Sequence, residues 1–152
     1  MPRILTGALL AFICCLVAAG CGRGVETVGD HAAPPGDVDS VIGRVNSFTA
    51  ELTGAVESAP DTKAGIAAGQ KMLDSRKAEL AASIAALKGD AKLRQDAAAR
   101  RKWLEAEVDN TDRVSRLQVK YLDASMRDPD FKARLDRLVG DYNSMFKDAA
   151  PR

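Results

Sequence analysis

Three carboxylates near the middle of the chain have a spacing that could support chemistry. Glu105, Asp109 and Asp112 lie at positions i, i+4 and i+7, so a helix would present them on one face. Paired carboxylates can act as acid and base on a glycoside, or they can bind a hard cation. A sugar pocket needs aromatic residues, which are only 5% of the chain, and Arg113 and Arg116 lie close enough to neutralise the acids. We therefore interpret these carboxylates as part of a solvated helix face.

The other residues that could do chemistry lack their usual partners. The single histidine, His31, lies in a segment rich in glycine and proline, outside the part of the chain with helical periodicity. It therefore cannot complete a Ser-His-Asp triad or a Glu-x-x-His di-iron site inside a folded domain. The three cysteines form no Cys-x-x-C pair, and the chain has no G-x-S-x-G, P-loop or dinucleotide-binding motif. The sequence predicts no enzyme, no cofactor and no metal site.

A basic cluster precedes the acids. Residues 92–102 contain five basic residues against one acid, Asp96. Such a cluster could bind lipid phosphates, wall polymers or an acidic partner, although alternating charge blocks are also normal on solvated helices. The only tryptophan borders the cluster. Tryptophan and arginine are enriched at binding hot spots, whereas a single tryptophan on an amphipathic helix is commonly half-buried core. If the chain binds a partner here, the expected contacts are Arg100, Arg101, Lys102 and Trp103.

The composition is that of one globular domain. The chain has 152 residues, of which 46% are hydrophobic and 28% charged, and this argues against a disordered chain. Its 22 lysines and arginines balance 21 aspartates and glutamates, for a formal net charge of +1. Nucleic-acid-binding domains usually carry a clear basic excess, so we expect no nucleic-acid partner.

Residues 1–20 have the regions of an export signal. Arg3 and the amino terminus supply positive charge, and an uncharged, largely apolar run of 16 residues follows, from Ile4 to Ala19. A membrane-spanning helix needs about 20 apolar residues, so this run is short for a stable span. It ends in small residues, as signal-peptide cleavage sites do. Cys21 follows immediately.

Small residues that lead from an apolar run into a cysteine resemble the lipobox of bacterial lipoproteins. The resemblance implies that Cys21 carries a diacylglycerol, often with a further acyl chain such as palmitate, and that the signal peptidase cuts just before it. Ala18, Ala19 and Gly20 would occupy the three positions before the cut. Ala18 departs from the leucine that most often fills the first of them, and the alternative is an ordinary secretory signal without a lipid.

The distribution of cysteines favours lipidation. Cys14 and Cys15 would leave with the signal, so Cys21 would be the only cysteine of the mature chain. A lone free thiol is unusual in an exported protein, whereas an acylated one is expected. The next residue is Gly22 rather than the aspartate that tends to retain such lipoproteins at the inner membrane. The resemblance therefore implies the periplasmic face of the outer membrane, if the source is Gram-negative.

A flexible tether is expected between the anchor and the folded part. Residues 22–36 contain four glycines and two prolines without an apolar period, which is typical of a linker. The predicted organisation is a signal peptide over residues 1–20, a lipidated cysteine and linker over 21–36, and a helical domain over 37–149.

The remaining sequence has the periodicity of amphipathic helices. No proline occurs between Pro60 and Pro129, and no segment alternates with the period of a strand. In the stretch Asp128-Pro129-Asp130, an N-cap, a first-turn proline and an acid indicate the start of the last helix. The recurrence of apolar residues predicts helices over residues 38–58, 61–88, 90–127 and 128–149.

The third of these segments is long for a bundle, since a helix over residues 90–127 would measure about 57 Å. Residues 90–102 offer few large apolar side chains, so we expect a break near residues 89–97 and a helical extension over 90–102. In the second segment, Gly65 and Gly69 indicate either close packing or simple tolerance of glycine. The later part of the third segment predicts a core face of Leu104, Val108, Val114, Leu117, Tyr121 and Leu122.

These elements predict an all-α fold: an antiparallel bundle of three to four helices, running up-down-up-down, behind a flexible N-terminal tether. The alternative is a long hairpin of the second and third helices with the other two packed on part of it. Through its lipid anchor the chain would have the membrane as a partner. We expect a protein or envelope polymer as a further partner, in a protein-interaction or structural role. The alternative is an envelope binding protein that holds a small apolar or anionic ligand between its helices.

Overall fold

The computed structural model describes residues 38–147. The predicted cleavage site from Ala18 to Gly20, the predicted lipidation site Cys21 and the linker lie outside the described residues, as do residues 148–152. None of the described helices is long and apolar enough to cross a membrane. They are α1 (Val38–Glu57), α2 (Thr62–Gly89), α3 (Ala91–Gln95), α4 (Ala97–Lys120), α5 (Leu122–Arg127) and α6 (Pro129–Lys147).

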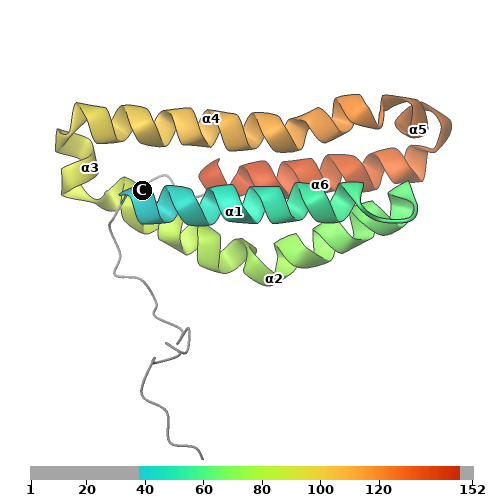
Figure 1. Cartoon of the computed structure of the whole chain (residues 1–152), viewed down its shortest axis with the longest axis horizontal. Helices are drawn as coiled ribbons and strands as arrows, with labels where there is room; N and C mark the ends of the chain where they lie inside the picture. The colour runs from blue at the N-terminus through green and yellow to red at the C-terminus, as the bar shows by residue number, and fades with distance from the viewer. Residues whose placement is uncertain (1–37, 148–152) are drawn as a thin grey trace, which may run out of the picture. The chain divides into compact units, whose positions relative to one another are not determined.

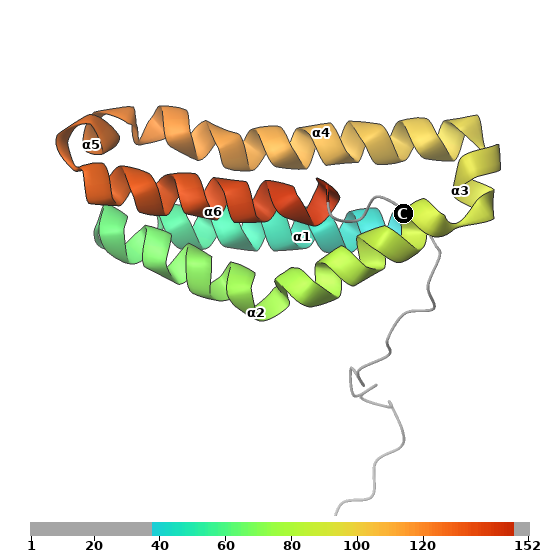
Figure 2. The same cartoon turned by 180° about the vertical axis from the view of Figure 1, so that it is seen from behind.

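The four long helices α1, α2, α4 and α6 form the predicted all-α bundle (Figure 1). Consecutive long helices run in opposite directions, as predicted. Their order around the bundle differs from the simplest up-and-down arrangement, because α1 and α6 each pack against both α2 and α4. α2 and α4 therefore lie on opposite sides of the pair α1 and α6 (Figure 2). α4 packs along α1, to which it runs parallel, whereas it meets α2 near Lys88 without packing along it.

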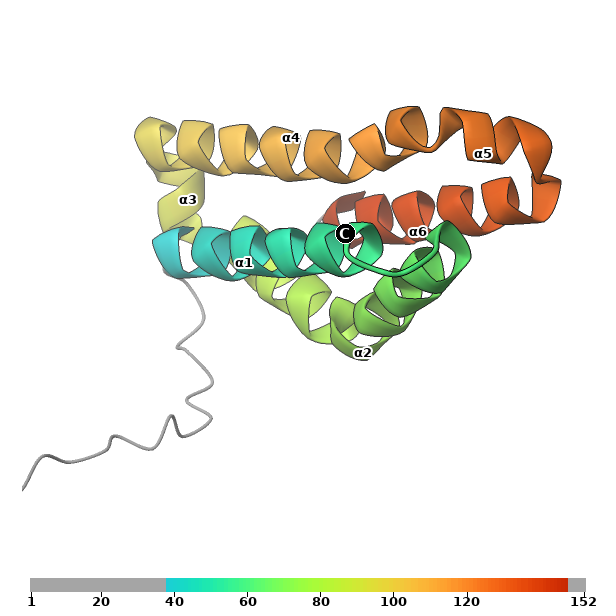
Figure 3. The same ribbon diagram turned by 45° about the vertical axis from the view of Figure 1, so that its right-hand side comes forward.

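The short helix α3 makes the crossing from α2 to α4 at one end of the bundle (Figure 3). The predicted break near residues 89–97 is confirmed, since turns separate α2, α3 and α4 there. The predicted extension over residues 90–102 is wrong. Leu93 on α3 is only 6% exposed and Trp103 on α4 only 3%, because both side chains join the core. Their burial turns this segment back onto the end of the bundle.

Aspartates start the helices, as their N-cap preference predicts. Asp61 and Asp96 each accept a hydrogen bond at 2.8 Å from a backbone N–H of the following turn. Asp128 caps α6 and also forms an ion pair with Lys63 at 2.6 Å. The hydrogen bond from Lys63, together with the backbone donors, holds the pKa of Asp128 below its ordinary value. The predicted start of the last helix at Pro129 is confirmed.

The core joins α1 to α6 across the bundle. Phe48 of α1 stacks on Tyr142 of α6, with ring centroids 6.4 Å apart. Thr49 donates its hydroxyl hydrogen to the carbonyl oxygen of Val45 at 2.8 Å, so Tyr142 must donate in its hydrogen bond to Thr49. Burial raises the pKa of Tyr142 to about 12. A buried tyrosine thus contributes packing and satisfies its hydroxyl at the same time.

α1 and α2 approach each other closely at two glycines. A Cβ atom added at Gly65 would lie 2.3 Å from the carbonyl oxygen of Val56. One added at Gly69 would lie 2.6 Å from the Cγ2 atom of the same valine. The close-packing interpretation of the two glycines is therefore confirmed. α2 is bent near its middle (Figure 2). Ser75, at the middle of this helix, donates a hydrogen bond to the carbonyl of Met72 at 2.7 Å. Hydrogen bonds from a serine hydroxyl back to the preceding turn often bend helices.

The core face of α4 differs in part from the predicted one. The prediction is wrong for Leu104, Val108 and Leu122, which are 58%, 63% and 54% exposed. It is confirmed for Val114 and Leu117, which are buried. The difference begins at the first turns of α4, where Trp103 faces the core in place of the predicted Leu104.

Trp103 and Asn110 explain this difference. Both are buried, and they set which side of α4 faces α1 and α6. Successive residues of a helix are about 100° apart, so the neighbours of a buried tryptophan turn away from the core. The Nδ2 group of Asn110 donates to Asn46 of α1 at 2.6 Å and to the carbonyl of Ala106 at 2.7 Å. A hydrogen-bonded asparagine thus fills a core position that apolar periodicity cannot identify.

Candidate functional site

The predicted partner contacts at the start of α4 do not form one accessible surface. Arg101 pairs with Glu105 at 2.8 Å, which is the pairing that their i,i+4 spacing favours. Lys102 forms an ion pair with Asp39 of α1. Arg100 donates to the carbonyl of Arg94 at 2.8 Å. Each basic side chain therefore already has an intramolecular partner.

Trp103 belongs to the core and is not an exposed anchor. Its ring centroid lies 6.2 Å from that of Phe146, and the ammonium group of Lys88 lies 5.9 Å from the tryptophan ring. Lys88 also donates to the carbonyl of Phe146 at 2.6 Å and pairs with Glu107 at 3.4 Å. A surface hollow of about 310 Å³ lies here, bordered also by Leu93. Trp103 is therefore buried because it packs against Phe146 and lies beside Lys88.

The three carboxylates on α4 are neutralised by neighbouring arginines. Asp112 accepts a hydrogen bond from Arg116 at 2.9 Å, and Glu105 is held by Arg101. Asp109 lies beside Asp112 at a small hollow that is lined otherwise by two arginines. Among residues 38–147, no group of three or more His, Cys, Asp or Glu side chains is placed to hold a metal ion. The interpretation of this face as a solvated, ion-paired surface agrees with the contacts.

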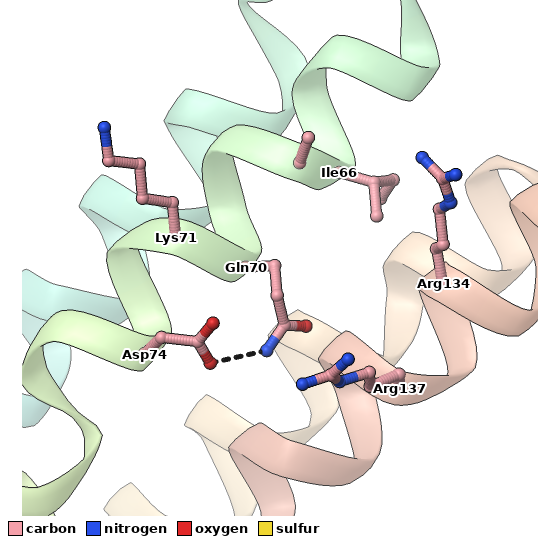
Figure 4. A pocket seen from close by; sticks show the side chains of 7 residues that line it. Ile66, Gln70, Lys71, Asp74, Arg134 and Arg137 are labelled. Atoms are coloured by element: carbon pink, nitrogen blue, oxygen red, sulfur yellow. Dashed lines mark hydrogen bonds between the residues drawn. The ribbon is translucent and has the colours of Figure 1, made fainter.

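A larger hollow of about 410 Å³ lies between α2 and α6 (Figure 4). Some of the polar groups at its wall are joined by hydrogen bonds: Gln70 donates to Asp74 at 2.8 Å and to Asp141 at 3.1 Å. Arg137 also donates to Asp141, at 3.4 Å. The side chain of Lys71 points away from the hollow. This network joins α2 to α6, so its geometry is explained by helix packing.

Unexpectedly, an apolar surface runs along the outside of α4 and α5. Val119 and Met126 are 75% and 69% exposed, and they join the three side chains that were wrongly predicted to be buried. Within the described residues, these five are the only large hydrophobic side chains that are exposed. Two small polar residues lie between them. We call this surface the apolar stripe, made of Leu104, Val108, Thr111, Ser115, Val119, Leu122 and Met126.

The spacing along α4 keeps the five stripe residues of that helix on one side. Their successive positions are three or four residues apart, and at 100° per residue they fall within an arc of about 80°. Leu122 and Met126 lie beyond the turn at Tyr121, on α5. The direction of this arc is roughly 130° from that of the buried residues of α4. The sequence does contain a signal for it, because residues 103–126 carry two apolar periods, one beginning at Trp103 and one at Leu104. Only one of them can face the core.

No protein-family model, curated protein or solved structure matches the chain.

Proposed function

We propose that the chain is a lipid-anchored protein of the bacterial envelope whose helical domain binds a protein partner through the apolar stripe. The observation that carries the proposal is that all five exposed large hydrophobic residues of the described chain lie on α4 and α5, with the three on α4 sharing one face of that helix. Single exposed apolar residues are common, but a continuous exposed patch favours an interaction surface.

The charges beside the apolar stripe favour a protein over a membrane or a wall polymer. Glu105 and Asp112 lie along one edge of its α4 part, at about 80–100° from Leu104 in helical projection. Acidic residues are repelled by anionic lipid headgroups. The stripe contains no aromatic residue on which a sugar ring could stack. Aliphatic side chains edged with mixed charges resemble the core and rim of a protein interface.

The alternative of a small ligand held between helices is less well supported. The hollow between α2 and α6 is the natural place for it, with cationic Arg134 and Arg137 at its wall. The hydrogen bonds of Gln70 to Asp74 and Asp141, however, already engage two of the carboxylates there. An anion would have to compete with this network, whereas no residue between 38 and 147 covers the large hydrophobic side chains of the apolar stripe.

A photo-crosslinking side chain at Val119 is expected to yield specific protein adducts in cells that express the full chain. Val119 is the most exposed member of the apolar stripe, at 75%. The matched control is the same side chain at Ala78, an exposed position on α2. Adducts at Val119 should disappear when Leu104 and Leu122 are both replaced by aspartate, since buried carboxylates oppose association. Equal adducts at both positions, or adducts that survive these aspartates, would contradict protein binding at the stripe.

Replacing Cys21 with alanine is expected to abolish incorporation of radiolabelled palmitate and to block normal maturation. The reason is that the acyl chains would be attached at this residue, and two or more chains are needed for firm membrane binding. Cys15→Ala is the matched control, because that cysteine should leave with the signal and its loss should spare labelling. A wild-type chain that never takes up label would defeat the lipoprotein assignment.

A further inference from the structure

We infer that the hollow beside Trp103 binds an anionic phospholipid, with the phosphate group at its rim and the beginning of one acyl chain in its apolar part. The hollow measures about 310 Å³, and its apolar part is lined by Leu93, Trp103 and Leu104. This volume is at the lower end of the roughly 300–1,000 Å³ of small-molecule sites, so it suits part of an acyl chain and not a whole lipid. We call it the α3 hollow, because it lies at the end of the bundle that α3 crosses.

The charged residues of the α3 hollow include two arginines that no acid neutralises. Lys88 and Glu107 also line it, but they pair with each other at 3.4 Å, so their charges cancel. Arg94 and Arg100 border the hollow as well, and no acidic side chain among residues 38–147 forms an ion pair with either. Arg100 does donate to the carbonyl oxygen of Arg94 at 2.8 Å. A carbonyl does not cancel a positive charge, and a guanidinium group has five N–H donors, so an anion could still bind both arginines.

A phosphate group joined to an acyl chain matches both parts of the α3 hollow. Guanidinium groups bind phosphate oxygens through paired N–H donors, and they are less strongly hydrated than the ammonium group of lysine. An acyl chain would cover the exposed side of Leu104, which is 58% exposed. Free phosphate would satisfy the arginines alone and leave the apolar lining in water. The combination therefore favours an anionic amphiphile over a simple anion.

The place where α1 begins favours a membrane lipid as the source, and this step rests on the lipid anchor of the proposed function. α1 begins at Val38, at the same end of the bundle as α3 (Figure 3). Asp39 forms an ion pair with Lys102, the residue before Trp103. The linker predicted after Cys21 has an expected span of roughly 20–25 Å. The other end of α1 lies about 30 Å beyond Val38, so an anchored chain would present the α3 hollow to the membrane more readily than the opposite end.

Quenching of tryptophan emission by brominated lipids tests the inference on the full chain. Trp103 is the only tryptophan, so its emission reports on the α3 hollow alone. The chain is reconstituted in vesicles of equal parts phosphatidylglycerol and phosphatidylcholine, with bromines near the glycerol end of the acyl chains of only one lipid. Brominated phosphatidylglycerol should quench at least about twofold more strongly than brominated phosphatidylcholine, because the arginines attract the anionic lipid.

Two pairs of substitutions locate the charge that selects the lipid. Arg94→Gln with Arg100→Gln should make the two brominated lipids quench equally. Arg116→Gln with Arg127→Gln is the matched control, since it removes the same charge from exposed positions outside the α3 hollow and should keep the preference. These changes leave the apolar stripe intact. Inorganic phosphate, compared with chloride at the same ionic strength, should not remove the preference, because it cannot replace the acyl chain.

Equal quenching by both lipids in the parent chain overturns the inference, as does a preference that survives Arg94→Gln with Arg100→Gln. A preference that inorganic phosphate abolishes would identify a site for the free anion and overturn the lipid assignment. Flotation of the vesicles separates the lipid site from the anchor. A chain that floats without a lipid preference keeps the anchor and loses the lipid site, whereas a chain that does not float loses both. The photo-adducts at Val119 decide independently whether the apolar stripe binds a protein.

Discussion

Replacing Trp103 with alanine is expected to lower the free energy of unfolding by about 3–5 kcal/mol. The side chain is 3% exposed, and it lies beside Phe146 of α6 and the ammonium group of Lys88, near the end of α2. It therefore ties three helices together at the end of the bundle that α3 closes. Removing it leaves a large cavity beside the two turns that join α2, α3 and α4. Chemical denaturation of residues 32–152, a compact unit that contains the whole described core, measures the loss.

The neighbouring residue gives a matched control for this measurement. Leu104→Ala removes a large side chain one position along the same helix, but that side chain is 58% exposed. Its effect should stay within about 0.5 kcal/mol. Trp103→Phe should lose much less than Trp103→Ala, because the indole N–H has no hydrogen-bond partner in the described part of the chain and only ring volume is lost. Equal losses for Trp103→Ala and Leu104→Ala would mean that the core face of α4 is wrongly placed.

The same two residues show where sequence patterns reach their limit. Both Trp103 and Leu104 begin series of apolar residues with helical spacing, so periodicity alone cannot decide which series is buried. The buried series contains Asn110, a polar residue whose hydrogen bond to Asn46 exists only once α1 and α4 have come together. The choice is thus made by tertiary contacts. The predicted core face combines members of both series, so it does not separate the apolar stripe from the core.

Local features were predicted far better than the order of the helices around the bundle. Asp61 and Asp128 act through atoms within a few residues of themselves, so the starts of α2 and α6 could be predicted. The pairing of Arg101 with Glu105 is equally local. The ion pair of Lys102 with Asp39, in contrast, depends on α4 lying beside α1. Nothing local specifies that α3 crosses the end of the bundle and makes α1 and α4 neighbours.

Replacing Gly65 with alanine is expected to destabilise the domain by roughly 1–3 kcal/mol, although alanine is the better helix former. The added Cβ would lie 2.3 Å from the carbonyl oxygen of Val56. That oxygen belongs to the backbone of α1, so it cannot rotate away, and the two helices must separate. Separation would loosen the tightest contact between α1 and α2. Chemical denaturation of residues 32–152 measures the change.

Two other glycines make this prediction specific to the close contact. Gly54→Ala meets no atom within 4 Å, so it should stabilise the domain by about 0.5–1 kcal/mol through helix propensity alone. Gly69→Ala should fall between the two variants, since it meets the Cγ2 atom of Val56 at 2.6 Å and a side chain can change rotamer where a backbone oxygen cannot. If Gly65→Ala were as stable as Gly54→Ala, α1 and α2 could not lie as close as the structure places them. Gly65 would then be a glycine that the helix merely tolerates, and the close contact between α1 and α2 would lie elsewhere along the two helices.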